Sequence, residues 1–224
     1  GDGSYQVGNP GRGILAAMPR ARQHYAALEL SFEALTGSGL SLQGSYVLSR
    51  NVGNYTGLYA SDFMIGWPNS GPQYDFPDLM KHAYGLLPND RTQVAKMTVG
   101  YRATRALTLG AFLQIASGTP LSEYAASAYD QTYRTFVRAR GSAGRTPAIW
   151  SLDLHGAYEL PARSGRVRPR VLVDVFNVGS PRTPLLYDQQ HYLDAAQTQV
   201  NQNYRTVTRY QPPMSARVGM EVSF

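Results

Sequence analysis

The sequence has no cysteine and only two lysines, Lys81 and Lys96, among its 224 residues. The lack of cysteine excludes disulfide bridges, thiol catalysis and zinc–thiolate sites. It also has no run of about 18 or more apolar residues, which excludes a transmembrane helix. A membrane-spanning β-barrel stays open, because alternation dilutes its apolar residues.

Two further absences bear on location and partners. The first residues, Gly1–Tyr5, lack the basic and apolar regions of a signal peptide. We therefore expect either a cytosolic chain or a natural start that lies upstream. The net charge of +6 comes from arginines scattered over turns and loops, with no basic helix and no aromatic RNA-binding motif. We expect no nucleic-acid partner.

No catalytic constellation is present. The four histidines, His24, His82, His155 and His191, are far apart and lack the spacing of a metal-binding helix. We expect no enzyme activity, no cofactor and no metal site. One alternative is a cation held by Asp188, His191 and Asp194 in a long loop, against an ordinary polar surface loop.

The strongest positive signal is the last segment, 216–224, where apolar and polar residues alternate up to a final aromatic residue, Phe224. Strand side chains alternate between the two faces of a sheet. Outer-membrane barrels close on such a strand and so leave no free edge. The pattern therefore predicts a terminal barrel strand.

The same alternation recurs in six earlier segments. The seven segments are 25–35, 40–49, 93–102, 107–115, 148–160, 168–175 and 216–224. Three connections are short, at 36–39, 103–106 and 161–166, and three are roughly 30 to 40 residues long, at 51–91, 117–146 and 178–211. Outer-membrane barrels have short periplasmic turns and long extracellular loops. We expect an all-β fold, an antiparallel transmembrane β-barrel segment of about seven strands.

An odd number of crossings cannot close a standard bacterial barrel. We therefore expect residues 1–224 to be the C-terminal part of a larger barrel whose earlier strands are absent here. One alternative is a self-contained structural or adhesive outer-membrane protein, closed by self-association or by an eighth strand within 1–20. Another is a soluble glycan-binding β-sandwich, which would pack its apolar faces against each other.

The alternation also sorts the polar residues. Charges on the lipid side cost about 2–4 kcal/mol each for Arg or Lys at the midplane, so charged strand residues should face the lumen. These are Glu29, Glu33, Lys96, Arg102, Asp153, Glu159, Arg168, Arg170, Asp174, Arg217 and Glu221. They can pair across strands and dock a plug, or line a permeation route. His155 shares that face, where we expect a hydrogen-bond network.

Tyrosines are the most frequent aromatic residues of the long loops. They can contact a ligand by stacking and hydrogen bonding, or pack the loops and form an aromatic girdle. The candidate ligand contacts are Tyr55, Tyr59, Tyr129, Tyr133 and Tyr192.

Several motifs, in their order and spacing, resemble the C-terminal region of TonB-dependent outer-membrane receptors, most closely the Oar-like branch with a carboxypeptidase-regulatory-like domain. The motifs are Tyr46-Val47-Leu48-Ser49-Arg50, Gly53-Asn54-Tyr55-Thr56-Gly57-Leu58, Leu87-Pro88-Asn89-Asp90-Arg91, Leu109-Gly110-Ala111-Phe112, Ser117-Gly118-Thr119-Pro120, Arg140-Gly141-Ser142-Ala143-Gly144-Arg145-Thr146-Pro147, Trp150-Ser151-Leu152-Asp153-Leu154 and Asp174-Val175-Phe176-Asn177-Val178.

The resemblance implies a barrel of about 22 strands in the bacterial outer membrane that passes a large ligand. It further implies contacts with outer-membrane lipid, with the plug and the rest of the barrel, and with the TonB complex through the N-terminal part that is missing here. It also implies that Phe224 serves as a signal to the barrel-assembly machinery.

Overall fold

A computed structural model describes residues 8–63, 66–68, 71–129, 133–161, 167–179 and 182–224. Within them, each segment expected from the alternation forms a strand. The strands are β1 (Gln23–Leu35), β2 (Leu40–Gly53), β4 (Gln93–Arg102), β5 (Leu107–Ala116), β8 (Ile149–Glu159), β9 (Arg168–Phe176) and β13 (Ser215–Ser223). The predicted turn at 161–166 lies outside the described residues except for Pro161.

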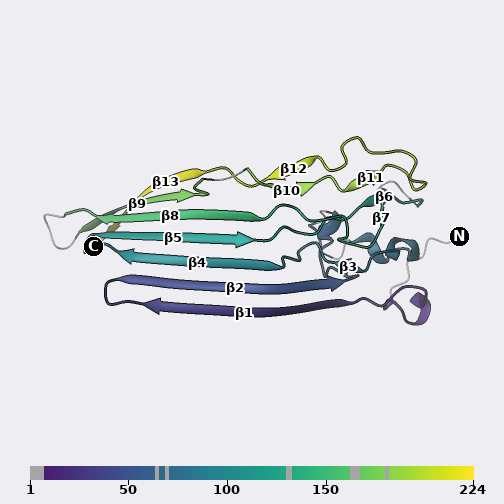
Figure 1. Ribbon diagram of the computed structural model, residues 1–224, viewed down its shortest axis with the longest axis horizontal. Coiled ribbons are helices and arrows are strands. Elements are labelled where there is room, and N and C mark those ends of the chain that lie inside the picture. The colour runs from purple at the N-terminus through teal and green to yellow at the C-terminus, as the bar shows by residue number, and fades with distance from the viewer. Residues whose placement is uncertain (1–7, 64–65, 69–70, 130–132, 162–166, 180–181) are drawn as a thin grey trace.

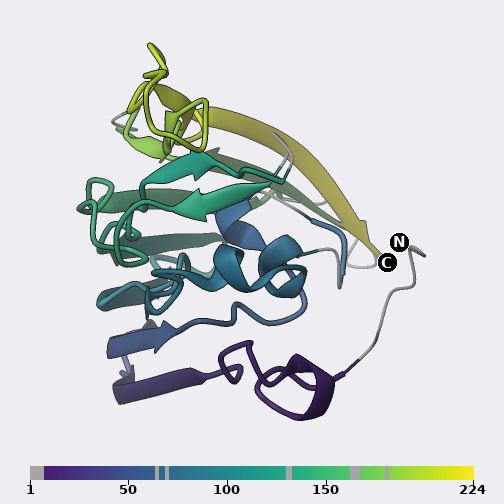
Figure 2. The same ribbon diagram turned by 90° about the vertical axis from the view of Figure 1, so that its right-hand side faces the viewer.

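These strands form one antiparallel sheet in the order β1-β2-β4-β5-β8-β9-β13, to which the short strand β3 (Gly85–Leu86) adds by pairing with β2. The tight turns and the C-terminus lie at one end of the strands, and the long connections gather at the other (Figure 1). The sheet is curved (Figure 2), with β1 and β13 at its two edges. Within the described residues it does not close into a barrel.

The long connections have structure of their own, which the sequence pattern did not indicate. They contain the short 3-10 helices η2 (Ser61–Phe63), η3 (Pro72–Tyr74) and η4 (Pro77–Met80). They also contain the strands β6 (Tyr124–Ala126), β7 (Arg134–Phe136), β10 (Pro184–Tyr187), β11 (Gln190–Tyr192) and β12 (Val207–Tyr210). Two small sheets result, β11-β6-β7 and β10-β12.

Residues 8–20 hold a 3-10 helix, η1 (Gly13–Leu15), and no strand. In this part of the chain the alternative of an eighth strand is therefore wrong; residues 1–7 are outside the described part. No helix that the structure describes is long and apolar enough to cross a bilayer.

The buried apolar cluster lies among the loops, not on the long sheet. Met18, Met80, Ala83, Tyr124 and Phe136 pack together there. Neither face of the long sheet takes part in this buried cluster.

Candidate functional site

The strand register places the apolar side chains of all seven long strands on one face. A single row across the sheet runs through Ala34, Leu42, Val99, Ala111, Leu154, Val175 and Ala216. A slip of one residue at any pairing would break this row, because neighbouring side chains point to opposite faces. The matched registers therefore create one continuous apolar surface.

This surface is not covered by any other described part of the chain. Leu30 is 57% exposed and Met220 is 69% exposed, although both lie in the middle of their strands. A β-sandwich would bury this face against a second sheet. In the described residues no second sheet covers this face, which leaves an apolar face that needs an apolar environment.

Aromatic side chains mark both ends of the apolar face. Trp150 and Tyr158 lie on this face of β8, eight positions apart, or about 26 Å at 3.3 Å per residue. Tyr101 joins Tyr158 near the turn end, since it pairs with Leu109 and Tyr158 pairs with Leu107. Barrel strands tilt about 35–45°, so this distance along β8 projects to roughly 20 Å along the membrane normal. That height lies within the apolar band, about 25 Å tall, that transmembrane barrels have between two aromatic girdles.

The opposite face carries the charges, and the structure brings some of the expected lumen residues together. Asp174 accepts a hydrogen bond from His155 Nδ1 (2.6 Å) and from Arg217 Nη2 (2.8 Å) across three neighbouring strands. Arg170 Nη1 lies 4.0 Å from Glu221 Oε2. The hydrogen-bond network expected on the face of His155 is therefore present, and it consists of His155, Asp174 and Arg217.

The remaining expected residues of this face have separate environments. Asp153 accepts a hydrogen bond from the backbone N–H of Asn177 (2.8 Å). Arg168 lies opposite Ser223, and Glu159 lies opposite Arg170 in the ladder. Charges of both signs thus alternate along the β8-β9-β13 part of the sheet, which suits cross-strand pairing more than a single-sign binding patch.

At the loop end, two ion pairs join the second long connection to the first, and one of them, Arg140–Asp62, is fully buried. Arg140, which is 1% exposed, places its Nη2 atom 2.9 Å from Asp62 Oδ2 and its guanidinium 4.7 Å from the centre of the Phe136 ring. Arg145 forms an ion pair with Asp90 and donates to the Gly118 carbonyl (2.9 Å). Burial raises the pKa of Asp62, and the charge of Arg140 opposes this shift. The charge of Arg140 therefore offsets part of the cost of burying the Asp62 carboxylate.

A third charged cluster joins the second and third long connections. Glu123 is buried. It accepts a hydrogen bond from His191 Nδ1 (2.6 Å) and forms an ion pair with Arg138. Burial alone would raise the pKa of Glu123, but the hydrogen bonds from His191 and Arg138 outweigh it and lower the pKa. The His191 ring is stacked between Tyr192 and Tyr204, each 4.1 Å away.

These contacts rule out the alternative cation site in the third connection. His191 is committed to Glu123, Asp188 accepts from Asn201 Nδ2 (2.9 Å), and Asp194 accepts from the Thr198 hydroxyl (2.7 Å). In the described residues no group of three or more His, Asp or Glu side chains could hold a metal ion.

The five candidate tyrosines do not converge on one site. Tyr129 stacks on Phe76 at 4.0 Å, and Tyr133 meets the same ring edge-on at 5.8 Å. Tyr55 contacts the edge of the Tyr74 ring at 6.3 Å. Tyr59 is half exposed, and Tyr192 stacks on His191. Packing within and between the loops accounts for the ring contacts of the other four tyrosines.

The ion pairs of the loops were missed from the sequence. Their partners are far apart in the chain, and of these residues only Asp90, Arg140 and Arg145 lay in motifs that the resemblance singled out. The alternation of apolar and polar residues cannot reveal such pairs. It indicates a strand and the two faces of that strand, but not which loops contact each other.

Comparison with known proteins supports the family resemblance. The chain is 27% identical over 259 aligned positions, which cover 99% of it, to the TonB-dependent transporter Oar of Myxococcus xanthus, and it spans 24% of that protein's length. Among solved structures, the ferric-catecholate import receptor Fiu of E. coli K12 matches with a TM-score of 0.49 and 12% identity, over 92% of this chain and 22% of that one. No protein-family model matches the sequence.

TonB-dependent transporters are outer-membrane proteins and are not enzymes, in agreement with the expected location and the expected lack of enzyme activity. The expected resemblance is confirmed: across nearly its whole length, this chain is similar to a TonB-dependent transporter of the Oar type.

Proposed function

We propose that this chain forms the C-terminal part of the barrel wall of a TonB-dependent outer-membrane transporter that moves a large ligand. The observation that carries the proposal is the shared register, which puts apolar residues of seven strands on one face and nearly all strand charges on the other. The apolar face contacts outer-membrane lipid, and the charged face lines the lumen.

In this arrangement the loop end lies outside the cell and the tight turns lie in the periplasm. The lumen face carries the His155–Asp174–Arg217 network and the Arg170–Glu221 pair, where a plug domain would dock. The rest of the barrel pairs with the free edges of β1 and β13. TonB acts on the transporter through an N-terminal part outside this chain. Phe224 follows β13 directly, where the barrel-assembly machinery can read it.

The loops supply the outer surface for ligand contact. Tyr55, Tyr59, Tyr129, Tyr133 and Tyr192 lie in the long connections. Tyr55, Tyr59 and Tyr129 are exposed, and their rings are suited to stacking on a large ligand. The hydroxyl groups of Tyr129 and Tyr133 already donate to Asp78 and Asp75. The ion pairs of Arg140, Arg145 and Glu123 hold these loops in a preformed arrangement.

Single cysteines test this topology, because the chain contributes none of its own. In the full transporter on intact cells, a membrane-impermeant maleimide should label a cysteine that replaces the exposed Tyr59 and should not label one that replaces Ser38 in the β1–β2 turn. Labelling of both positions after permeabilisation is the control. Labelling of Ser38→Cys on intact cells, with Tyr59→Cys protected, would reverse the proposed orientation.

A further inference from the structure

Two basic side chains break the separation of charge between the faces of the long sheet. His24 and Arg50 occupy apolar-face positions. All other charged residues and histidines of the seven long strands lie on the charged face. His24 pairs with Val52, and Arg50 pairs with Ala26. They are thus diagonal neighbours on β1 and β2, with Cα atoms about 7–8 Å apart, within reach of one shared ligand.

Nothing in the described structure neutralises these two groups. Both side chains are exposed, and no acidic residue of the seven long strands shares their face. Arg22 lies next to this end of the ladder, where its backbone N–H donates to the Asn54 side-chain Oδ1 (2.7 Å) and its carbonyl accepts from the Asn54 backbone N–H (3.0 Å). Because a lipid-facing arginine costs least near the membrane interface, this pair marks the headgroup level at the loop end.

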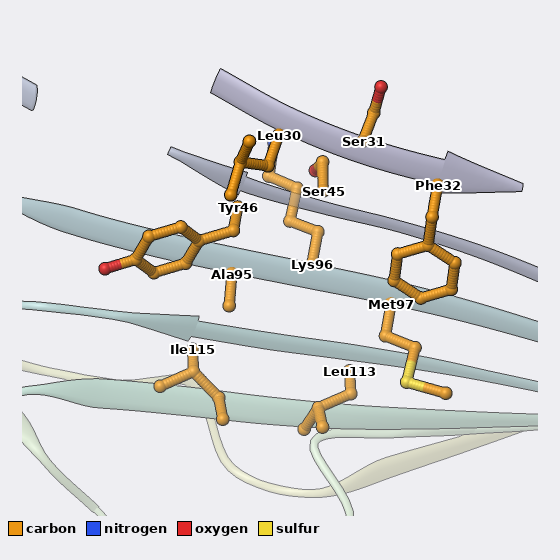
Figure 3. Close-up of a pocket in the computed structure, with 10 residues that line it drawn as sticks. All are labelled: Leu30, Ser31, Phe32, Ser45, Tyr46, Ala95, Lys96, Met97, Leu113 and Ile115. Carbon is orange, nitrogen blue, oxygen red and sulfur yellow. The ribbon is translucent and has the colours of Figure 1, made fainter. Parts of the chain in front are cut away.

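A hollow of about 480 Å³ lies on the same face, further toward the turn end. The side chains of Tyr46, Phe32, Met97, Leu113 and Ile115 surround the short side chain of Ala95 (Figure 3). The Phe32 ring packs directly over Gly44, in the space that a larger side chain there would need, and so forms one wall of the hollow. Apart from the Tyr46 hydroxyl, the side chains that surround Ala95 are hydrocarbon or thioether.

The spacing between the basic pair and the hollow fits within one leaflet. Tyr46, at the rim nearest the loop end, is four positions from Arg50 on β2, about 13 Å along the strand, or roughly 10 Å along the membrane normal for a strand tilted 35–45°. Half of a hydrocarbon core of 30 Å is about 15 Å, so this depth lies among the acyl chains of one leaflet. A lipid with its phosphate at Arg50 would therefore place an acyl chain over Ala95.

We propose that this surface of β1, β2, β4 and β5 binds an anionic, phosphate-bearing lipid of the outer leaflet. Arg50 and His24 bind the phosphate, and the hollow around Ala95 holds one acyl chain. The site rests on the proposed membrane orientation of the apolar face. It goes beyond general lipid contact, because it recognises both the phosphate charge and an acyl chain of the same lipid.

Native mass spectrometry of the full transporter, released from phosphatidylcholine nanodiscs that contain lipid A, tests the site. The wild-type protein should retain lipid A in preference to phosphatidylcholine. Arg50→Gln should lower the retained lipid A about fivefold, the loss expected for one cationic contact at a membrane surface. Ala95→Phe, which fills the hollow, should also lower retention.

Matched controls separate the possible failures. Arg102→Gln removes an arginine from the charged face, and Ala111→Phe enlarges a small residue of the apolar face outside the hollow. Both should retain lipid A as the wild type does. Equal retention by Arg50→Gln and Arg102→Gln, or unchanged retention in Ala95→Phe, would overturn the lipid site. A protein that does not insert into the nanodisc would instead refute the proposed function.

Discussion

Replacing Arg140 by methionine is expected to loosen the long connections while the long sheet stays folded. The change leaves the Asp62 carboxylate buried without its partner, and removing one member of a buried ion pair costs about 3–5 kcal/mol. Because burial raises the pKa of Asp62, the variant can escape part of this cost by taking up a proton. The loss should therefore be largest at neutral or higher pH.

Hydrogen exchange of the full protein in membranes measures this loss locally. Amide protection should fall in the connections that hold Asp62 and Arg140 and stay unchanged in β4 and β5. Arg105→Met, in the exposed β4–β5 turn, is the matched control and should change little.

A double variant, Arg140→Met with Asp62→Leu, should recover much of the protection, since an apolar pair often replaces a buried ion pair without loss. If Arg140→Met left loop protection as it is in the wild type, the ion pair would not hold the loops together.

The second large effect concerns the two faces of the sheet. Leu154→Arg places a charge at the centre of the apolar face and should cost about 2–4 kcal/mol of folding free energy in the membrane. Phe112→Arg is the matched control, because it makes the same kind of change on the charged face, directly opposite Asp153 on the neighbouring strand. It should be tolerated, since the new guanidinium can pair with that carboxylate.

The fraction of the full transporter that shows heat-modifiable migration after assembly measures this difference. A large loss for Leu154→Arg and a small one for Phe112→Arg is the expected pattern. Equal losses would mean that lipid covers neither face selectively.

The strands of the long sheet could be predicted because alternation is a local property of the sequence. The segment 107–115, for example, corresponds to β5, which extends to Ala116. The face of each strand followed from the same pattern, so the charged residues of β8, β9 and β13 were placed together correctly. The apolar-face position of Arg50 could have been found by continuing the alternation of β2 past Leu48.

The organisation of the loops could not be predicted in this way. Arg140 and Asp62 are far apart in the chain, and only the fold brings them to 2.9 Å. The parallel pairing of β11 with β6 joins two different connections and has no local signature. His191 illustrates the limit: its neighbours in sequence suggested a cation site, while its partner Glu123 comes from another connection.

The central claim is that the apolar face of the long sheet meets lipid and the charged face meets the lumen. Spin labels placed one at a time from Trp150 to Tyr158 along β8 test it most directly, through their accessibility to oxygen and to a water-soluble nickel complex in membranes. Labels at 150, 152, 154, 156 and 158 should favour oxygen, and labels at 151, 153, 155 and 157 should not. An accessibility without this two-residue period, or with the opposite phase, would contradict the account.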